Sequence, residues 1–425
     1  MMHDSIAQRF PDIERLRPIM RAIAQDHPTP LYVYDSDEVR KNYRAFVAAF
    51  QAQHIPMDVY YATKSNPYIG VLRTVVEEGG GLDISSPREL ALALEAKAKR
   101  IIFTGPAKSE ADFRAILPLA DRIMVNLESL RELRLLSRIA SEAGQTIRCG
   151  VRVCCRHQQH WKKFGIALET LSAFLQEART LPGIRCCGIH YHVSHDGTPE
   201  RSVQTIDELG EILKQDLSPE ELQHLEYLDI GGGFAPHEFE GKHSWNPEQE
   251  TLLISEGLDV ENLLRENITD RYITDTIVPI EEFVAQIGSA LRRSIFSLQP
   301  NIHIFTEPGR YLCHSAMHML LTLVEKKSKT MGIADGGVNM VGWEKYECYY
   351  YVPIFNLTHF SLNTEIPFLL YGSLCTPDDV WGYSVHCSSI KEGDVVWLPY
   401  QGAYTFTTAA TFIRDIPPVI DLPTK

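Results

Sequence analysis

The sequence predicts an α/β protein with a (β/α)8, or TIM, barrel followed by a C-terminal antiparallel β domain. Two patterns indicate this fold. Apolar, strand-like runs alternate with helical stretches in eight units over roughly 250 residues, which is the spacing of such a barrel. Beyond Arg310 the strand-like runs are short and no helices separate them. A doubly wound sheet is the alternative, but the first strand lacks the glycine fingerprint of dinucleotide-binding folds.

We expect three parts along the chain. Residues 1–37 form an N-terminal helix and strand that pack with the β domain, residues 38–312 form the barrel, and residues 313–425 form the β domain. Residues 1–27 are amphipathic with helical spacing, and Thr29-Pro30 begins a strand at residues 31–34. Asp35-Ser36-Asp37 then caps the next helix.

The barrel and β-domain elements follow from the same patterns. Barrel strands are predicted at residues 57–62, 81–84, 101–103, 123–125, 147–153, 184–193, 225–230 and 302–305. The helices between them are predicted at residues 67–78, 87–98, 108–119, 127–143, 168–180 and 199–215. The β-domain strands are predicted at residues 320–324, 330–334, 349–355, 368–371 and 395–398. Residues 236–278 are polar and acidic, so we expect an elaborated loop with short helices at the C-terminal face of the barrel.

Composition narrows the classes of function. The chain has 425 residues and a net charge of −14, which argues against nucleic acid and anionic membranes as partners. The longest apolar stretch, residues 316–324, is too short to span a bilayer. The first residues lack the apolar segment of a signal peptide, and the nine cysteines have no metal-type spacing. We therefore expect a cytoplasmic protein with reduced thiols.

The stretch from Val59 to Pro67 contains the first candidate for chemistry. Its apolar part ends just before Lys64, and Asn66-Pro67 breaks the chain into a loop. A lysine at the end of a buried strand is costly unless it is paired, neutralised or covalently used. On this stretch alone a lysine that reaches out to solvent is the simpler interpretation. The chemical interpretation is a lysine that holds pyridoxal phosphate as a Schiff base.

Two further motifs follow strands near the C-terminal face of the barrel. Three successive glycines, Gly231, Gly232 and Gly233, allow backbone N–H groups to converge on an anion, although a tight turn explains them equally well. The run Glu307-Pro308-Gly309-Arg310 places a carboxylate and a guanidinium on either side of a turn. Arginine suits a phosphate, and a glutamate beside a pyridine nitrogen would keep that nitrogen protonated.

His190 and His192 lie on one face of a predicted strand and Tyr191 on the other. A histidine on a strand is usually a satisfied core or rim residue. Two histidines with a carboxylate could also indicate a metal, but the spacing shows no third ligand, so we expect no metal.

Together these motifs resemble the fold-type-III pyridoxal-phosphate decarboxylases, which include the ornithine and diaminopimelate decarboxylases. The resemblance runs from Thr29 to Phe412 and keeps the family's order of motifs. It implies a pyridoxal 5'-phosphate (PLP)-binding barrel and PLP-dependent decarboxylation of an amino acid. In that family the lysine matching Lys64 forms the Schiff base, the histidine matching His192 stacks on the pyridine ring, and the glutamate matching Glu307 pairs with the pyridine nitrogen.

The remaining cofactor contacts are also carried over from the resemblance. The triple glycine holds the phosphate together with the turn that bears Gly309 and Arg310. Asp83 and Glu89 match acidic residues near the lysine, and Tyr404 matches a tyrosine segment that reaches the phosphate. His192 is followed by Val193-Ser194-His195 instead of the family's usual His-x-Gly-Ser, so Ser194 or His195 would have to replace a serine contact.

The C-terminal motif implies a shared active site. Gly372-Ser373-Leu374-Cys375 matches the family's catalytic cysteine loop, which enters the partner subunit's site in a homodimer. Taken alone, Cys375 would be a small buried hydrophobe. In the family position it donates a proton to the product carbanion.

The residues after Cys375 bear on the substrate. Ornithine and diaminopimelate decarboxylases carry an acidic residue there, whereas this chain has Cys375-Thr376-Pro377-Asp378-Asp379. Cys-Thr-Pro resembles a branch found in siderophore and other specialised biosynthesis. Glu347 matches a second carboxylate for the distal end of the substrate. We take Glu347, Thr376, Asp378 and Asp379 as candidate substrate residues.

Three functions are compatible with these motifs. The first is a decarboxylase of an amino acid or amino-acid conjugate, with ornithine/diaminopimelate-type decarboxylation in primary metabolism as its alternative. The second is a racemase on the same barrel, which the glutamate of Glu307-Pro308-Gly309-Arg310 disfavours because racemases keep the pyridine less protonated. The third is an inactive regulatory homologue, which retention of Lys64, His192 and Cys375 disfavours.

Overall fold

The computed structural model describes residues 10–158, 162–193, 197–236, 277–342 and 352–423. The chain divides into two compact units. One unit comprises residues 40–235 and 276–312, and the other comprises residues 1–39, 236–275 and 313–425. No described helix has the length and apolar character needed to cross a membrane.

The first unit is a closed barrel of parallel strands. Its strands are β2 (Met57–Ala62), β3 (Gly81–Ile84), β4 (Ile101–Phe103), β5 (Ile123–Leu127), β6 (Ile147–Cys154), β8 (Ile184–His190), β9 (Tyr227–Asp229) and β10 (His303–Thr306). Each strand pairs in parallel with its neighbours, and the pairings of β10 with β2 and of β5 with β6 close the ring. A two-residue strand, β7 (Ile166–Ala167), pairs beside β6. The predicted (β/α)8 barrel is confirmed.

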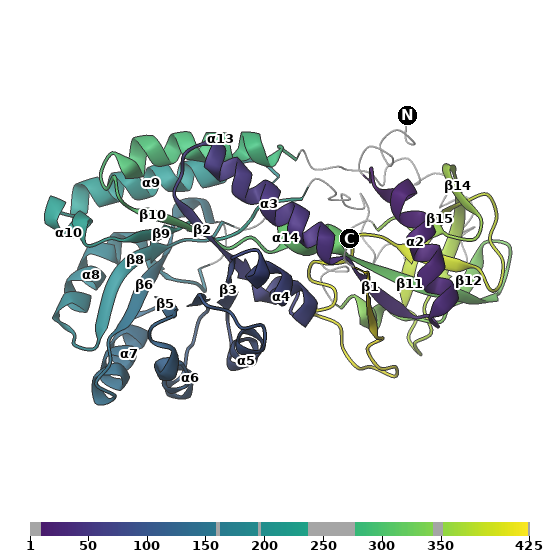
Figure 1. The fold of residues 1–425 in the computed structure, drawn as a ribbon, viewed down its shortest axis with the longest axis horizontal. Helices are drawn as coiled ribbons and strands as arrows, with labels where there is room; N and C mark the ends of the chain where they lie inside the picture. The colour runs from purple at the N-terminus through teal and green to yellow at the C-terminus, as the bar shows by residue number, and fades with distance from the viewer. Residues whose placement is uncertain (1–9, 159–161, 194–196, 237–276, 343–351, 424–425) are drawn as a thin grey trace. The chain divides into compact units, whose positions relative to one another are not determined.

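Helices cover the outside of this barrel (Figure 1). They are α3 (Ser36–Ala52), α4 (Ile69–Glu77), α5 (Pro87–Glu95), α6 (Glu110–Ile116), α7 (Leu130–Glu142), α8 (Leu171–Thr180), α9 (Glu200–Asp216), α10 (Pro219–Gln223) and α13 (Ile280–Leu291). Several begin at a serine whose side chain accepts a hydrogen bond from the third helical N–H, as Ser86 does for α5 and Ser129 for α7. These caps set where each helix leaves its loop.

Aromatic side chains fill the interior of the barrel. Tyr227 stacks on Phe305 with their ring centroids 4.6 Å apart, and Tyr60 meets Phe305 edge-on at 5.0 Å. Together with Ile102 and Met124 they form a buried cluster. The barrel is therefore a packed core, which leaves its strand ends to carry chemistry.

The second unit is a mostly antiparallel sheet. In sequence order its strands are β1 (Leu31–Tyr34), β11 (Met317–Lys326), β12 (Met331–Ala334), β13 (Phe355–Asn356), β14 (Phe360–Tyr371), β15 (Val380–Cys387), β16 (Val395–Leu398) and β17 (Val419–Asp421). Side by side, they run β12-β14-β15-β13-β16-β11-β1-β17. Helix α2 (Ile13–Asp26) buries Ile13, Leu16 and Met20 against a core that contains Leu320 and Trp397. The predicted C-terminal β domain is confirmed.

The details of this sheet differ from the prediction. Strands β15 and β17 were not predicted, and β14 begins at Phe360 rather than at residue 368. Three pairings are parallel: β12 with β14, β13 with β15, and β1 with β17. Of the predicted strand at residues 349–355, the first three residues lie outside the described part. The loop predicted at residues 236–278 also lies almost entirely outside it.

Candidate active site

Lys64 lies in a short 3-10 turn, Thr63–Ser65, directly after β2. Its side chain is 39% exposed, and Nζ lies 3.4 Å from Oδ2 of Asp83, whose side chain is fully buried. Strands β2 and β3 are parallel neighbours with Ala62 opposite Asp83, so their C-terminal ends bring the amine and the carboxylate together. Lys64 therefore has both an acidic partner and access to solvent.

The turn that carries Arg310 packs directly on this lysine turn. Ala62 N donates a hydrogen bond to Pro308 O at 3.3 Å. A Cβ added at Gly309 would lie 2.8 Å from Ser65 Oγ, so only glycine allows this close approach. Arg310 then begins α14 (Arg310–Cys313) and is 8% exposed. The structure thus brings the predicted Gly309 and Arg310 to the Lys64 end of the barrel.

Glu307 is buried directly after β10. Its Oε1 accepts a hydrogen bond from Thr104 Oγ1 at 3.1 Å. Its Oε2 lies 3.5 Å from His190 Nε2 and 3.9 Å from His192 Nδ1. The glutamate and the two histidines therefore meet across the same mouth of the barrel.

These three residues also satisfy the geometry of a possible metal site. One ligand atom from each of His190, His192 and Glu307 lies within 4.8 Å of the others. The sequence showed no third ligand at recognisable spacing, but the fold brings one to the two histidines. Glu307 supplies it from a strand far along the chain, where residue spacing gives no signal. However, His192 Nδ1 already accepts a hydrogen bond from Gly232 N at 3.1 Å, which occupies its lone pair.

The triple-glycine loop follows β9 and wraps around His192. Gly231 has φ +67°, and a Cβ there would lie 2.6 Å from Tyr191 O and 2.8 Å from His192 Nδ1. A Cβ on Gly232 would lie 2.5 Å from Glu307 O. Burial, and then the charge of Lys64, lowers the pKa of His192 well below its usual value. The imidazole is therefore neutral, as its hydrogen bond from Gly232 requires.

The buried carboxylates of the site have different pKa shifts. Burial and the charge of Glu307 raise the pKa of Asp83 and of Asp229 well above the usual range. Burial acts in the same direction on Glu307, but His190 and then Lys64 outweigh it and lower the pKa of Glu307. Glu307 is therefore the acid in this group that holds its negative charge most strongly.

The predicted residues of the cysteine loop lie in the β-domain unit. Cys375 is exposed in the loop between β14 and β15, so the interpretation of a small buried hydrophobe is wrong. Thr376 is half-buried and Asp378 is exposed. Asp379 is 1% exposed, and its carboxylate accepts hydrogen bonds from Val338 N at 2.7 Å and Leu374 N at 2.6 Å.

Tyr404 is half-buried in the same unit, with φ +59°. Glu347, Ser194 and His195 lie outside the described residues.

Sequence reasoning missed two polar residues of the barrel site, Thr104 and Asn126. Thr104 donates to Glu307, and Asn126 Nδ2 donates to Thr104 Oγ1 at 3.2 Å and to Asp229 Oδ2 at 3.1 Å. Each follows or ends a barrel strand, Thr104 after β4 and Asn126 in β5. Their position at the C-terminal ends of predicted strands was the available signal.

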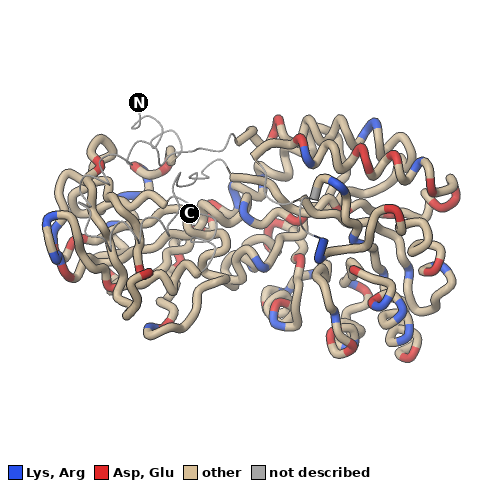
Figure 2. The backbone as a smooth tube through the Cα atoms, turned by 180° about the vertical axis from the view of Figure 1, so that it is seen from behind, with Lys and Arg blue, Asp and Glu red and all other residues tan. Residues whose placement is uncertain are grey.

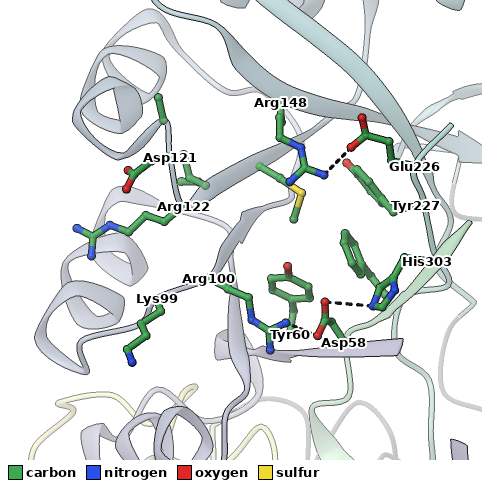
Figure 3. A pocket seen from close by; sticks show the side chains of 14 residues that line it. Asp58, Tyr60, Lys99, Arg100, Asp121, Arg122, Arg148, Glu226, Tyr227 and His303 are labelled. Atoms are coloured by element: carbon green, nitrogen blue, oxygen red, sulfur yellow. Dashed lines mark hydrogen bonds and ion pairs between the residues drawn. The ribbon is translucent and has the colours of Figure 1, made fainter. Parts of the chain in front are cut away.

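A separate cavity of about 500 Å³ lies at the N-terminal ends of the barrel strands (Figure 3). Its polar lining is largely paired. Asp58 bridges Arg100 and His303, and Arg148 pairs with Glu226 at 2.8 Å. The carboxylates of Asp58 and Glu226 in this lining pair with arginine and histidine side chains, not with a lysine amine.

The sequence of this chain matches a known protein family over the whole barrel unit. The family model for the pyridoxal-binding domain of pyridoxal-dependent decarboxylases matches residues 36–314. The chain belongs to the pyridoxal-dependent decarboxylases. It is accordingly a PLP-dependent carboxy-lyase that decarboxylates an amino acid, and its cofactor is pyridoxal 5'-phosphate.

Full-length relatives agree with this family. A diaminopimelate decarboxylase of Methanothermobacter thermautotrophicus is 26% identical over 406 residues, which cover 92% of this chain and 85% of the relative. A lysine/ornithine decarboxylase of Selenomonas ruminantium is 24% identical over 407 residues, with 92% and 89% covered. The crystal structure of Helicobacter pylori diaminopimelate decarboxylase complexed with L-lysine aligns with a TM-score of 0.76 at 20% identity. That alignment covers 96% of this chain and 94% of the other, and it shows the shared fold.

The residues at the barrel mouth fit the cofactor of these decarboxylases. A solvent-accessible lysine amine lies beside a buried carboxylate, as a covalently used lysine needs. Gly231 and Gly232 leave no room for side chains, so backbone N–H groups can approach an anion closely. Glu307, whose pKa is lowered, supplies a buried negative charge that suits a protonated pyridine.

Proposed function

We propose that this decarboxylase uses Lys64 to hold PLP and acts on an amino acid or amino-acid conjugate of a specialised pathway, such as siderophore biosynthesis. The observation that carries the cofactor assignment is the Lys64 amine 3.4 Å from the buried carboxylate of Asp83. It stands at the C-terminal mouth of a (β/α)8 barrel, where such enzymes place their chemistry.

Each end of the cofactor has candidate partners in the barrel unit. The backbone of Gly231, Gly232 and Gly233 and the guanidinium of Arg310 would hold the phosphate. Glu307 would pair with the pyridine nitrogen, and His192 would lie against the ring. Gly309 keeps the arginine turn close to Lys64, because a larger residue would collide with Ser65.

When bound, PLP supplies an electron sink for the pair of electrons released when the carboxylate leaves. The chain orients and tunes this chemistry. Lys64 would hold the cofactor through its amine and would yield that place to the substrate amine. The ionised Glu307 would keep a proton on the pyridine nitrogen, and Asp83 would keep the amine of Lys64 in position.

The proton that replaces carbon dioxide on the product needs a donor. We assign this proton transfer to the thiol of Cys375. In a homodimer, the second chain would contribute this Cys375 to the site. The exposure of Cys375 in a loop supports this role, because a buried thiol could not enter another chain's site. In the same arrangement Tyr404 would reach the phosphate.

The cysteine loop supports a substrate whose distal end is not a simple ammonium ion. A desolvated cation without a paired carboxylate would be penalised by several kcal/mol. Thr376 offers only a hydroxyl, and both oxygens of Asp379 already accept backbone N–H groups. Asp378 is exposed, and Glu347 is the other candidate carboxylate. A larger or less cationic amino acid is therefore the better match.

The alternative is a substrate of primary metabolism. The names of the relatives favour it, since they are diaminopimelate and lysine/ornithine decarboxylases. Either Asp378 or Glu347 would then have to pair with the distal cation.

Borohydride reduction of the PLP-loaded enzyme followed by peptide mapping tests the cofactor lysine. We expect the reduced pyridoxyl group on Lys64, and Lys64→Ala should neither take up the label nor release carbon dioxide above background. Lys214→Ala is a control, because Lys214 is exposed in the last turn of α9. A pyridoxyl group on any other lysine would refute the assignment.

Carbon dioxide release across a panel of amino acids and conjugates tests the substrate. We expect weak turnover of ornithine, lysine and diaminopimelate and faster turnover of a bulkier or less cationic compound. A kcat/KM for ornithine or diaminopimelate on the order of 10⁴ M⁻¹s⁻¹ or above would show that the specialised-pathway proposal is wrong. In that case Asp378→Ala and Glu347→Ala would identify the carboxylate that pairs with the cation.

A further inference from the structure

A buried chain of hydrogen bonds links Glu307 to the glycine loop. Thr104 Oγ1 donates to Glu307 Oε1 at 3.1 Å and accepts from Asn126 Nδ2 at 3.2 Å. Asn126 Nδ2 also donates to Asp229 Oδ2 at 3.1 Å, and Asp229 Oδ1 accepts from Gly231 N at 2.9 Å. All these side chains are at most 3% exposed. The chain thus connects the two motifs proposed to hold opposite ends of the cofactor.

The direction of each hydrogen bond follows from the donors available. The amide of Asn126 has two N–H protons, and the hydroxyl of Thr104 and the carboxylate of Asp229 accept them. Because the Thr104 oxygen accepts from Asn126, its own proton is directed to Glu307. Tyr227 OH donates to Asn126 Oδ1 at 3.2 Å, which fixes the amide in this orientation.

The barrel makes special room for this last contact. A Cβ on Gly188 would lie 2.1 Å from the Cζ of Tyr227, and a Cβ on Gly150 would lie 2.4 Å from its hydroxyl. Two glycines on β8 and β6 therefore allow the Tyr227 ring to extend from β9 to Asn126 on β5. Figure 3 shows the same tyrosine lining the cavity at the N-terminal end of the barrel, so its side chain spans the interior.

We propose that Thr104 and Asn126, held by Tyr227, are positioning residues that fix the Glu307 carboxylate for the pyridine nitrogen and tie it to the glycine loop. This inference rests on the proposed role of Glu307. Neither Thr104 nor Asn126 needs to touch the cofactor for this role. A carboxylate with one oxygen already bonded to a fixed hydroxyl cannot rotate freely, so its other oxygen keeps its direction.

The alternative is that these residues only support the fold. Thr104→Val removes the hydroxyl at nearly constant volume, and Thr104→Ser keeps it. Thr74→Val is a matched control, because Thr74 is also buried and its hydroxyl donates to Gly70 O within α4. A positioning role predicts that Thr104→Val loses PLP affinity and kcat, whereas Thr104→Ser and the control Thr74→Val keep both. A role in stability alone would not produce this difference.

Two measurements carry the test. The first is the dissociation constant of PLP for each apoprotein, and the second is kcat and KM normalised to bound cofactor. For Thr104→Val we expect PLP affinity to fall about tenfold and kcat to fall about tenfold with KM within a factor of two, the size of one hydrogen bond to a charged group. Tyr227→Phe should show a smaller change in the same direction. Thr104→Val with unchanged affinity and kcat would overturn the inference.

Glu307→Gln distinguishes failure of this inference from failure of the proposed function. If Glu307→Gln loses kcat and Thr104→Val does not, Glu307 keeps its role and only the positioning inference fails. If Glu307→Gln leaves both PLP affinity and kcat unchanged, the proposed role of Glu307 fails and the inference fails with it. When Thr104→Val is added to Glu307→Gln, it should cause little further loss. The hydroxyl that it removes would have bonded an uncharged amide instead of the Glu307 carboxylate.

Discussion

Asp83, Asp229 and Glu307 are all buried near the C-terminal ends of the barrel strands, yet their neighbours give them different pKa shifts. Burial and the charge of Glu307 raise the pKa of both aspartates, whereas His190 and Lys64 lower that of Glu307 despite its burial. Groups of titratable residues whose environments separate their pKa values commonly mark the acid and base assignments of a site. Here the separation concentrates negative charge on Glu307, where the proposed pyridine partner needs it.

A second buried titratable group lies in the β domain and affects stability rather than chemistry. His318 is fully buried on β11, where its Nδ1 accepts a hydrogen bond from Tyr400 N at 3.3 Å. Its ring lies 5.6 Å from that of Trp397. Burial, with smaller contributions from Arg15 and His314, lowers the pKa of His318 to about 3.

This shift predicts a loss of stability in mild acid. The unfolded chain takes up a proton on this imidazole near pH 6.5, but the folded chain does so only near pH 3. Between these values the unfolded state binds more protons, so stability falls as the pH falls. From pH 6.5 to pH 5 we expect His318 to account for about 1.6 kcal/mol, because the slope reaches about 1.4 kcal/mol per pH unit only when the unfolded imidazole is fully protonated.

Urea unfolding followed by Trp fluorescence would measure this effect in wild type and in His318→Gln, which keeps an acceptor for Tyr400 N. The variant should lose less stability than wild type between pH 6.5 and pH 5. Near pH 8 the His318 imidazole is neutral in both the folded and the unfolded wild type. The difference in free energy of unfolding between the two proteins should therefore not change with pH in that range. Equal acid sensitivity in the two proteins would contradict the prediction.

At the scale of elements, the loop between β14 and β15 is shaped by one carboxylate. Asp379 accepts hydrogen bonds from Val338 N and Leu374 N, and a Cβ on Gly372 would lie 2.4 Å from its oxygens. These contacts hold the chain on either side of the exposed Cys375. Asp379 thus supports the loop, although the sequence suggested it as a substrate residue.

We predict that Asp379→Asn loosens this loop. The carboxylate of Asp379 uses one oxygen for each of the two backbone N–H groups. The amide of asparagine has only one acceptor oxygen, so its NH2 group would face one of these backbone N–H donors and leave it without a partner. A buried donor left without a partner costs about 1–3 kcal/mol. We expect kcat to fall about tenfold, PLP affinity to stay unchanged, and alkylation of Cys375 by iodoacetamide to become faster.

Asp378→Asn is the matched control in the same loop, because Asp378 is exposed. It should leave the alkylation rate of Cys375 near the wild-type value. Identical alkylation rates for Asp379→Asn and wild type would show that Asp379 does not hold the loop.

At the scale of the whole molecule, the two proposed catalytic groups belong to different units. Lys64 lies in the barrel unit and Cys375 in the β-domain unit. Figure 2 shows acidic and basic residues distributed over both units. The proposed homodimer would combine Lys64 of one chain with Cys375 of the other.

Subunit complementation tests this shared site. Lys64→Ala and Cys375→Ala chains should each be inactive, or nearly so, as homodimers. A mixed dimer restores one complete site if the two groups come from different chains, so co-refolded mixtures should regain about a quarter of the wild-type activity at equal input by random pairing. No recovery in isolated, doubly tagged heterodimers would place both groups in one chain's site.

The strands of the barrel were predictable because their signals are local, whereas helices α10 and α13 were not predicted. Alternating apolar runs located every barrel strand, although the run at residues 184–193 extended past the end of β8 at His190. Lys64, the triple glycine and Glu307-Pro308-Gly309-Arg310 are contiguous motifs and need no knowledge of distant contacts. Strand β15 was missed because Gly382 and polar residues interrupt its apolar alternation.

What the sequence by itself determined is the barrel, the β domain and the motifs that match the PLP-dependent decarboxylases, because periodicity and short motifs are properties of neighbouring residues. Only the tertiary structure decided which side chains work together. Thr104 and Glu307 are 203 residues apart, and Asp379 bonds a backbone N–H 41 residues away. Such partners meet because parallel strands align their C-terminal ends and loops fold back on them, a geometry that spacing along the chain does not encode.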